Sequence, residues 1–154
     1  MKLLTSKPVL VSVALVVVVL LVGCGGDDKA KPVTSGKVSA KDLSVGTCVT
    51  DANSYVGDVT TFDAVDCAKS HDGEVFTIIA LAGEKYPGLE RVTAKGQRGC
   101  RARLRRQATA KAFRDRQLGF KFVYPTTTSW AQDDREITCL VTFKKPRTAK
   151  LAQR

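Results

Sequence analysis

EVFTIIAL, which runs from Glu74 to Leu81, is the clearest strand signal in this sequence of 154 residues. The stretch is rich in β-branched and aromatic residues, which pack well on a pleated sheet. Its apolar residues fall on both faces of the expected strand, as is typical of a strand that is covered on both sides. We therefore expect a sheet with this strand at its centre.

Shorter elements are expected on either side of this strand. Four further strands are predicted at residues 45–50, 62–67, 118–124 and 137–143, and residues 126–130 are predicted to form a loop. A helix is predicted from Leu89 to about Arg116, because small or apolar residues recur every four positions. These positions are Val92, Gly96, Cys100, Leu104, Ala108 and Ala112. The order predicts an α+β fold, in which a small, mostly antiparallel sheet packs against one main helix.

The N-terminal segment has the pattern of a lipoprotein signal peptide. Lys2 and Lys7 precede an apolar run over residues 8–23, which is shorter than the roughly 20 residues of a spanning helix. The run ends in LVGC, which matches a bacterial lipobox that finishes at Cys24. We expect residues 1–23 to be removed and Cys24 to carry diacylglycerol and a fatty acid such as palmitate. The alternative, an uncleaved anchor, would leave the domain on the same side of the membrane.

Three segments are expected after the signal peptide. Residues 24–42 are polar and small and are predicted to be a lipidated, flexible tether. Residues 43–146 are predicted to form the α+β domain, and residues 147–154 to form a frayed basic tail. The location that these segments predict is the outer face of the cell membrane.

The four remaining cysteines are expected to form disulfides, as an even number does in a small exported domain. Three pairings are open, and we favour Cys48–Cys67 and Cys100–Cys139. The first pair lies at the edges of one predicted strand pair, and the second would join the helix to the last strand. Zinc is disfavoured, because no two of these cysteines lie within a few residues of each other. We expect no metal and no cofactor.

An ordered set of short motifs carries a family resemblance. The set consists of GTCV at Gly46, VDCAKSHDGEVF at Val65, YPG at Tyr86, the helical Cys100, and YPTTTSWAQDDREITCL at Tyr124. This set resembles the septum-formation domain family of actinobacterial envelope proteins over residues 45–143. That family often has Pro at the position of Ser70 and Gly at the position of Asp133. The resemblance implies a link to septum formation, and it implies neither a reaction nor catalytic residues.

Charge is divided unevenly along the chain. Residues 24–88 hold six basic and ten acidic residues, whereas residues 89–154 hold 17 basic and five acidic ones. The basic residues are densest in the predicted helix, where Arg101, Arg105 and Arg106 are the expected contacts for a partner. The alternative is a solvated face that only keeps the domain soluble. Export and few interleaved aromatics argue against nucleic acid as the partner.

The sequence offers little for catalysis. Its single histidine, His71, has no identifiable nucleophile beside it, and we expect it to brace the loop between two strands. The leading hypothesis is a non-enzymatic interaction module that binds an anionic envelope component or a membrane or division protein. The alternative is a domain that binds a small ligand or cation with His71, Asp72 and Glu74. An envelope hydrolase would need two converging carboxylates, which a sequence cannot display.

Overall fold

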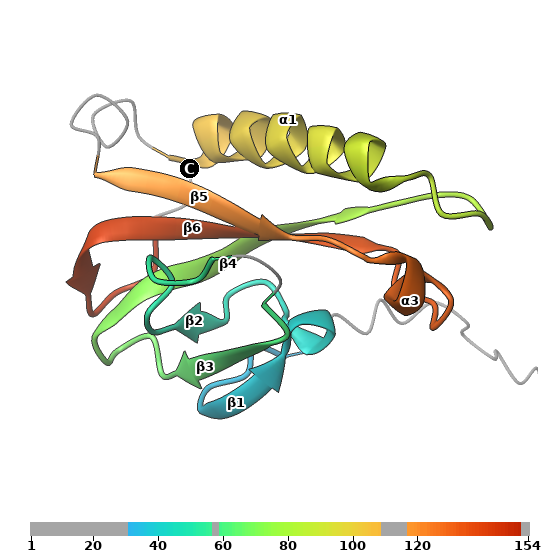
Figure 1. Cartoon of the computed structure of the whole chain (residues 1–154). Helices are drawn as coiled ribbons and strands as arrows, with labels where there is room; N and C mark the ends of the chain where they lie inside the picture. Colours follow the sequence, from blue (N-terminus) through green and yellow to red (C-terminus); the bar gives the residue numbers. More distant parts are fainter. Residues whose placement is uncertain (1–30, 57–58, 109–116, 152–154) are drawn as a thin grey trace, which may run out of the picture.

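The computed structural model describes residues 31–56, 59–108 and 117–151. Within these ranges the chain forms two layers, an antiparallel sheet and one long helix that covers one face of the sheet (Figure 1). The predicted α+β fold is therefore confirmed. The predicted signal peptide and Cys24 lie outside the described residues. No helix within the described ranges is long and apolar enough to span a membrane.

The sheet has six strands in the order β1-β3-β2-β4-β6-β5. The strands are β1 (Gly36–Ser39), β2 (Cys48–Val49), β3 (Thr61–Val65), β4 (His71–Ala80), β5 (Leu118–Val123) and β6 (Glu136–Arg147). The helices are the 3-10 turn η1 (Ala40–Asp42), α1 (Leu89–Gln107) and the short α3 (Thr127–Trp130). The predicted central strand is β4, which pairs with β2 on one side and β6 on the other.

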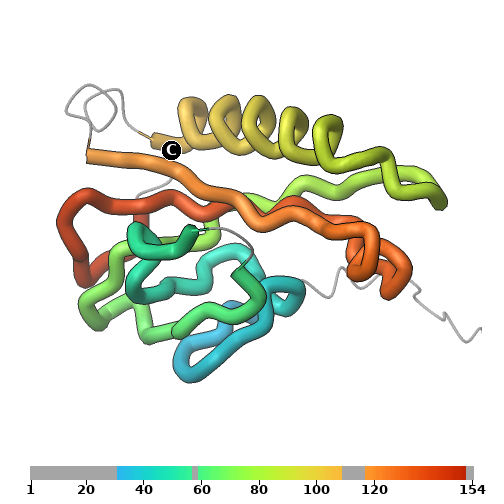
Figure 2. The backbone as a smooth tube through the Cα atoms, in the orientation of Figure 1, coloured from blue at the N-terminus to red at the C-terminus, as the bar shows by residue number. Residues whose placement is uncertain are grey.

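The sheet is strongly bent. Strands β1, β3 and β2 lie beneath the half formed by β4, β6 and β5, on the side away from α1 (Figures 1 and 2). The bend divides the core in two. Phe76 and Ile79 of β4 face the cluster under α1, whereas Val75 and Ile78 face the cluster enclosed by the bent half. The sequence therefore correctly predicted that β4 is apolar on both faces.

The stripe predicted for the helix is the buried face of α1. Val92, Gly96, Cys100 and Leu104 are all buried against the sheet. Gly96 permits a close approach, because a Cβ at this position would lie 2.5 Å from Cε2 of Phe122 in β5. The helix ends at Gln107, and residues 109–116 of the predicted helix lie outside the described residues.

Both preferred disulfides are present. Cys48 of β2 is bonded to Cys67, which follows β3, and Cys100 of α1 is bonded to Cys139 of β6. The first crosslinks neighbouring strands, and the second fixes the helix to the sheet. Such bonds persist in oxidising compartments outside the cytoplasm, and they are consistent with an extracytoplasmic domain.

Three local predictions were wrong. The tether was predicted to extend through residue 42, but residues 36–39 form β1, which pairs with β3 and places Val38 in a core. The tail was predicted to be frayed from residue 147, but Leu151 is buried and its N–H donates to Glu74 Oε2 at 2.7 Å. Residues 126–130, predicted as a loop, contain α3, whose first turn is closed by the side chains of Thr126 and Ser129. Contacts with distant residues order the first two segments, and a local capping contact orders the third.

Candidate functional site

The outer face of α1 is a dense cluster of positive charge. The helix holds seven basic residues and one acidic residue, Glu90. The basic residues are Arg91, Lys95, Arg98, Arg101, Arg103, Arg105 and Arg106. All except the half-buried Arg103 are exposed, and none forms an ion pair with a residue that the structure describes. The predicted contacts Arg101, Arg105 and Arg106 therefore lie on an accessible surface of uncompensated positive charge, which we call the basic face.

One residue of the basic face reaches the neighbouring strand. The guanidinium carbon of Arg101 lies 5.9 Å from the centre of the Phe120 ring in β5. A guanidinium at this distance from an aromatic face is attracted by the ring quadrupole. The contact places positive charge beside the outer strand of the sheet, so the basic face continues to the edge of β5.

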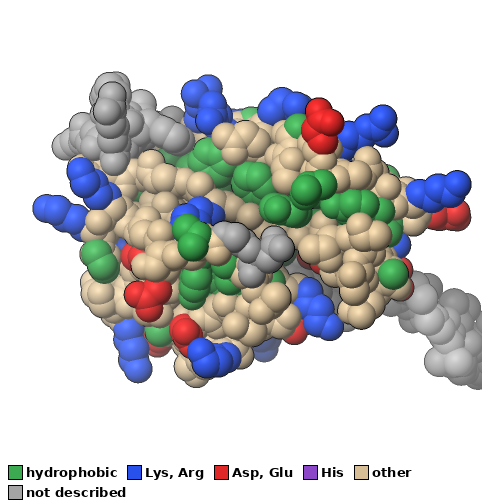
Figure 3. Space-filling model, viewed as in Figure 1, with side chains coloured by type: hydrophobic (Ala, Val, Ile, Leu, Met, Phe, Trp, Pro, Cys, Tyr) green, Lys and Arg blue, Asp and Glu red, His purple; other side chains and the backbone are tan. Residues whose placement is uncertain are grey.

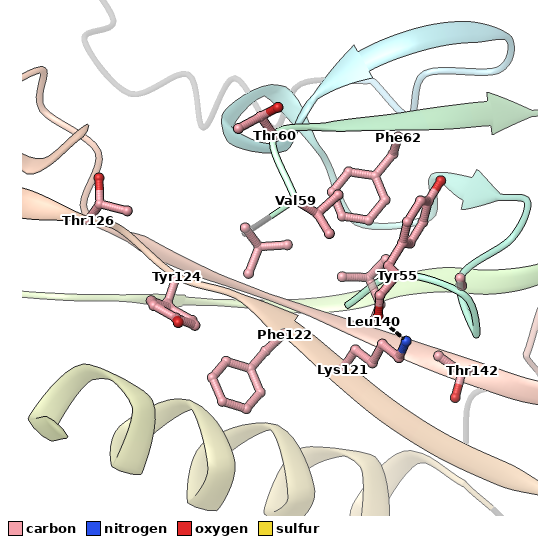
Figure 4. Close-up of a pocket in the computed structure, with 12 residues that line it drawn as sticks. Tyr55, Val59, Thr60, Phe62, Lys121, Phe122, Tyr124, Thr126, Leu140 and Thr142 are labelled. Atoms are coloured by element: carbon pink, nitrogen blue, oxygen red, sulfur yellow. Dashed lines mark hydrogen bonds between the residues drawn. The ribbon is translucent and has the colours of Figure 1, made fainter. Parts of the chain in front are cut away.

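Beneath β5, on the side of the sheet away from α1, the bend leaves a hollow surface. Two adjoining cavities of about 130 and 190 Å³ share lining from Val59, Val123 and Tyr124. Residues of β3, β5, β6 and the segment between β2 and β3 line the first cavity, and most of them are aromatic or aliphatic (Figure 4). Asp134 and Glu136 lie at the wall of the second. We call this surface, defined by the residues that line both cavities, the β5 groove.

Lys121 holds one end of the groove in shape. It extends from β5 across the groove, and its ammonium group donates hydrogen bonds to the main-chain oxygens of Asn53, at 2.9 Å, and Tyr55 (Figure 4). The Tyr55 hydroxyl in turn donates to the Thr50 carbonyl at 3.1 Å, and its ring packs edge-on against Phe62 at 4.8 Å. These contacts fix the loop that forms the wall opposite β5.

The mouth of the groove is apolar. Val56, which follows the lining residue Tyr55 in the sequence, is 86% exposed. Figure 3 shows hydrophobic side chains in a band between α1 and the lower strands, with Lys and Arg mainly around it. An apolar band bordered by charge is typical of a surface that contacts a partner.

The histidine site predicted by the sequence is a buried cluster. His71 begins β4 and is 1% exposed, and Glu74 is 2% exposed. The two side chains lie near Cys48, with one ligand atom of each residue within 4.8 Å of the others. The Cys48 sulfur is already bonded to Cys67, so it offers no thiolate to a metal.

Asp72 does not join this cluster. Its carboxylate accepts hydrogen bonds from the N–H groups of Ala52, at 2.8 Å, and Asn53, at 3.2 Å. The predicted set of His71, Asp72 and Glu74 is therefore divided, because Asp72 fixes the loop after β2. Nδ1 of His71 pairs with the Lys69 carbonyl oxygen at 2.8 Å, which agrees with the expected bracing role. Nε2 has no hydrogen-bond partner among the described residues.

Glu74 holds the end of the described chain. Burial raises the pKa of its carboxyl, and the hydrogen bond from the Leu151 N–H together with the charges of Lys150, His71 and Arg147 opposes this rise. A partly uncompensated buried carboxyl of this kind is stabilised when it is protonated. Through the hydrogen bond between Leu151 and Glu74, this buried cluster connects β4 to the segment after β6.

The aromatic residues near the C-terminal strands have separate roles. Trp130 is buried in the core under α1, and its Nε1–H donates a hydrogen bond to the Glu84 carbonyl oxygen at 2.8 Å. The centre of its ring lies 4.0 Å from the guanidinium carbon of Arg135. Phe143 is also in that core, and Tyr124 both packs against this core and lines the β5 groove. Trp130 and Phe143 are therefore core residues and do not line the groove.

Sequence reasoning missed most of the groove. Its lining includes Tyr55, Val59, Phe62 and Lys121, which come from three separate segments. Only the bend of the sheet brings them together, and no local pattern predicts that bend. The one available signal was Tyr55, an aromatic residue in a mostly polar, turn-rich stretch.

Comparison with known proteins gives one match. A family model described as Septum formation matches residues 45–154, which include all of the basic face, β5 and both disulfides. No curated protein and no solved structure matches the chain.

Proposed function

We propose that this chain, which belongs to the Septum formation family, is a non-enzymatic binding module of the cell envelope. It is held at the outer face of the membrane by lipid on Cys24, and it binds an anionic envelope component or an acidic membrane or division protein through the basic face. The observation that carries the proposal is the exposure of Arg101, Arg105 and Arg106 without ion pairs to described residues.

The physical basis is electrostatic. Like charges on one helix face repel one another, and this face spaces its arginines at three- and four-residue intervals, where side chains are neighbours. An anionic partner relieves that repulsion and accepts bidentate hydrogen bonds from the guanidinium groups. Such complementarity mainly raises the rate of association and the specificity of binding.

The location is supported by separate observations. Two disulfides indicate an oxidising compartment, and the lipobox that ends at Cys24 predicts attachment to the membrane. A membrane anchor also increases the effective concentration of a module for partners in the same membrane.

The proposal of a non-enzymatic role rests on the burial of the single histidine. His71 is 1% exposed, and Leu151 is bonded to its neighbour Glu74, so the residue best suited to acid–base work is covered. The same burial gives less support to a small-ligand site at His71.

Chemical cross-linking in the native membrane tests the proposal. The full chain with Cys24 intact is compared with the triple variant Arg101→Ser, Arg105→Ser and Arg106→Ser. A matched control, Lys41→Ser, Lys144→Ser and Lys145→Ser, removes the same charge from exposed positions outside α1. We expect only the arginine variant to lose the cross-linked partner. Capture of that partner by the unchanged chain should weaken as the salt concentration rises. Equal capture by both variants would refute a role for the basic face.

A further inference from the structure

Strand β5 leaves half of its main-chain hydrogen-bonding groups without a partner in the described part of the chain. It is the last strand in the sheet order and pairs only with β6. The Lys144 N–H donates to the Gln117 carbonyl at 3.0 Å, which fixes the register of hydrogen-bonded pairs. In an antiparallel ladder such pairs alternate, so Gly119, Lys121 and Val123 point their main-chain groups toward β6. Leu118, Phe120 and Phe122 point theirs outward, where no described residue bonds to them.

Among the described residues, this edge lacks the usual protection against pairing. Natural edge strands are commonly guarded by a charged side chain, a proline or a bulge. The one charged residue within β5 is Lys121, and its ammonium group is already bonded to Asn53 and Tyr55. The pairing of β5 with β6 has no register shift, so the edge is regular over all six residues. An exposed, regular and apolar edge is a template for another strand.

The two sides of this edge differ in chemistry. On one side, Arg101 stands over Phe120, and the rest of the basic face lies behind it. On the other side the edge borders the β5 groove, with Tyr55 and Val59 in its lining and Val56 exposed nearby. Successive side chains of an added strand would point alternately to these two sides. Acidic residues would suit the first side and aliphatic residues the second.

A second copy of this chain fits the edge poorly. Two β5 strands paired edge to edge would bring two basic faces together, because α1 packs against β5. Each α1 carries seven basic residues and one acidic residue, so the two faces would repel each other. The charge therefore favours a different, acidic chain.

We propose that the outer edge of β5 binds an extended peptide segment by strand addition, and that this segment alternates acidic and aliphatic residues. Its main chain pairs with Leu118, Phe120 and Phe122, its acidic side chains meet Arg101 and the basic face, and its aliphatic side chains enter the β5 groove. This inference rests on the proposed function and names the chemistry of the partner.

The test uses the full chain in nanodiscs of neutral phosphatidylcholine and a fluorescent octapeptide that alternates valine and glutamate. Binding is followed by fluorescence anisotropy. The control peptide has the same composition with all valines before all glutamates. Two further peptides carry N-methyl groups on every valine or on every glutamate. Because alternate N–H groups of a strand point to opposite edges, one methylated peptide loses at least about tenfold in affinity and the other does not.

Protein variants test the same contact from the other side. Phe120→Pro removes an outward N–H without touching the ladder to β6, and we expect peptide binding about fivefold weaker or worse. Phe120→Val keeps the N–H and serves as the matched control. Leu118→Pro, at the first strand position, repeats the test at a second outward N–H. Unchanged melting temperatures confirm that the variants are folded.

Several results would overturn strand addition. The first is equal affinity for the alternating peptide and for the control peptide with all valines before all glutamates. The second is retention of affinity by both methylated peptides. The third is a dimer of this chain that Phe120→Pro dissociates. Displacement of the peptide by phosphatidylglycerol nanodiscs, with no effect of Phe120→Pro on that lipid binding, would identify a lipid site instead. If the peptide fails while the arginine variant still loses its partner in native membranes, strand addition is refuted and the proposed function stands. If the peptide does not bind and the arginine variant keeps its partner in native membranes, strand addition and the proposed function are both refuted.

Discussion

Replacement of Gly96 by alanine tests how α1 supports β5. A Cβ at this position would lie 2.5 Å from Cε2, 2.6 Å from Cδ2 and 3.2 Å from Cγ of Phe122. Because Cγ itself is close, turning the ring about its own axis does not relieve the clash. Either the side chain must leave its position or β5 must move away from α1. A single methyl group thus disturbs the packing of α1 on the strand that lines the groove.

The expected change in the free energy of unfolding of Gly96→Ala follows from two opposing effects. Overpacking a tight contact lowers the free energy of unfolding by about 1–3 kcal/mol, whereas replacing a helical glycine by alanine raises it by about 1 kcal/mol. Gly99→Ala is the matched control in the same helix. There a Cβ would lie 2.6 Å from Cδ1 of Ile79, but the next atom, Cγ1, is 3.9 Å away. Rotation of the Ile79 terminus removes that clash, so this variant keeps most of the helical gain.

We therefore expect Gly99→Ala to exceed Gly96→Ala in unfolding free energy by about 1–2 kcal/mol, or roughly 5–15 °C in melting temperature for a domain of this size. Thermal and urea unfolding with the disulfides intact, followed by circular dichroism, measure the difference. Equal stability of the two variants, or a more stable Gly96→Ala, would refute the close packing of Phe122 on Gly96.

Three further predictions concern stability. Burial raises the pKa of Glu74, so its carboxyl stays protonated to a higher pH in the folded state than in the unfolded chain. The contribution of Glu74 to the free energy of unfolding is therefore full at low pH and falls as the pH rises past 4.5. Glu74→Gln should remove that fall, and parallel pH profiles of urea midpoints for the two proteins would count against it. Asp133 has φ 63°, where glycine is favoured, so Asp133→Gly should stabilise by up to about 1 kcal/mol and Asp133→Val should destabilise by about 1–2 kcal/mol; calorimetry showing the reverse order would refute the turn geometry. Replacing both members of Cys100–Cys139 or of Cys48–Cys67 with serine should cost about 4 and 3 kcal/mol, in the order of their separations of 39 and 19 residues, and chemical denaturation should reproduce that order.

Much of the fold could be predicted because it is encoded locally. The β-branched run in β4 and the four-residue stripe of α1 both reflect which faces are buried. The disulfide pairing followed once these elements were placed, since Cys100 lies on the stripe and Cys139 on the buried face of β6. The glycine that the family often has at position 133 has a physical reason, because Asp133 adopts a positive φ there.

The remaining features depend on contacts between distant segments. Val38 is ordered by pairing of β1 with β3, and Leu151 by a hydrogen bond to Glu74, 77 residues earlier. Neither contact leaves a local pattern, so both segments resembled loose tails. The basic face could be predicted from the helical spacing of its arginines. The β5 groove could not, because Lys121 and Tyr55 meet only through the bend of the sheet.

The most direct test of the central claim, that the basic face binds a partner in the envelope, is site-specific photo-cross-linking in the native membrane. The full chain carries p-benzoylphenylalanine in place of Arg105 on α1 or, as the control, in place of Lys145 near the end of β6; both positions are exposed. We predict a discrete protein adduct from position 105 that the Lys145 control does not form and that high salt suppresses. Adducts of equal yield from both positions, or none from position 105, would contradict the account.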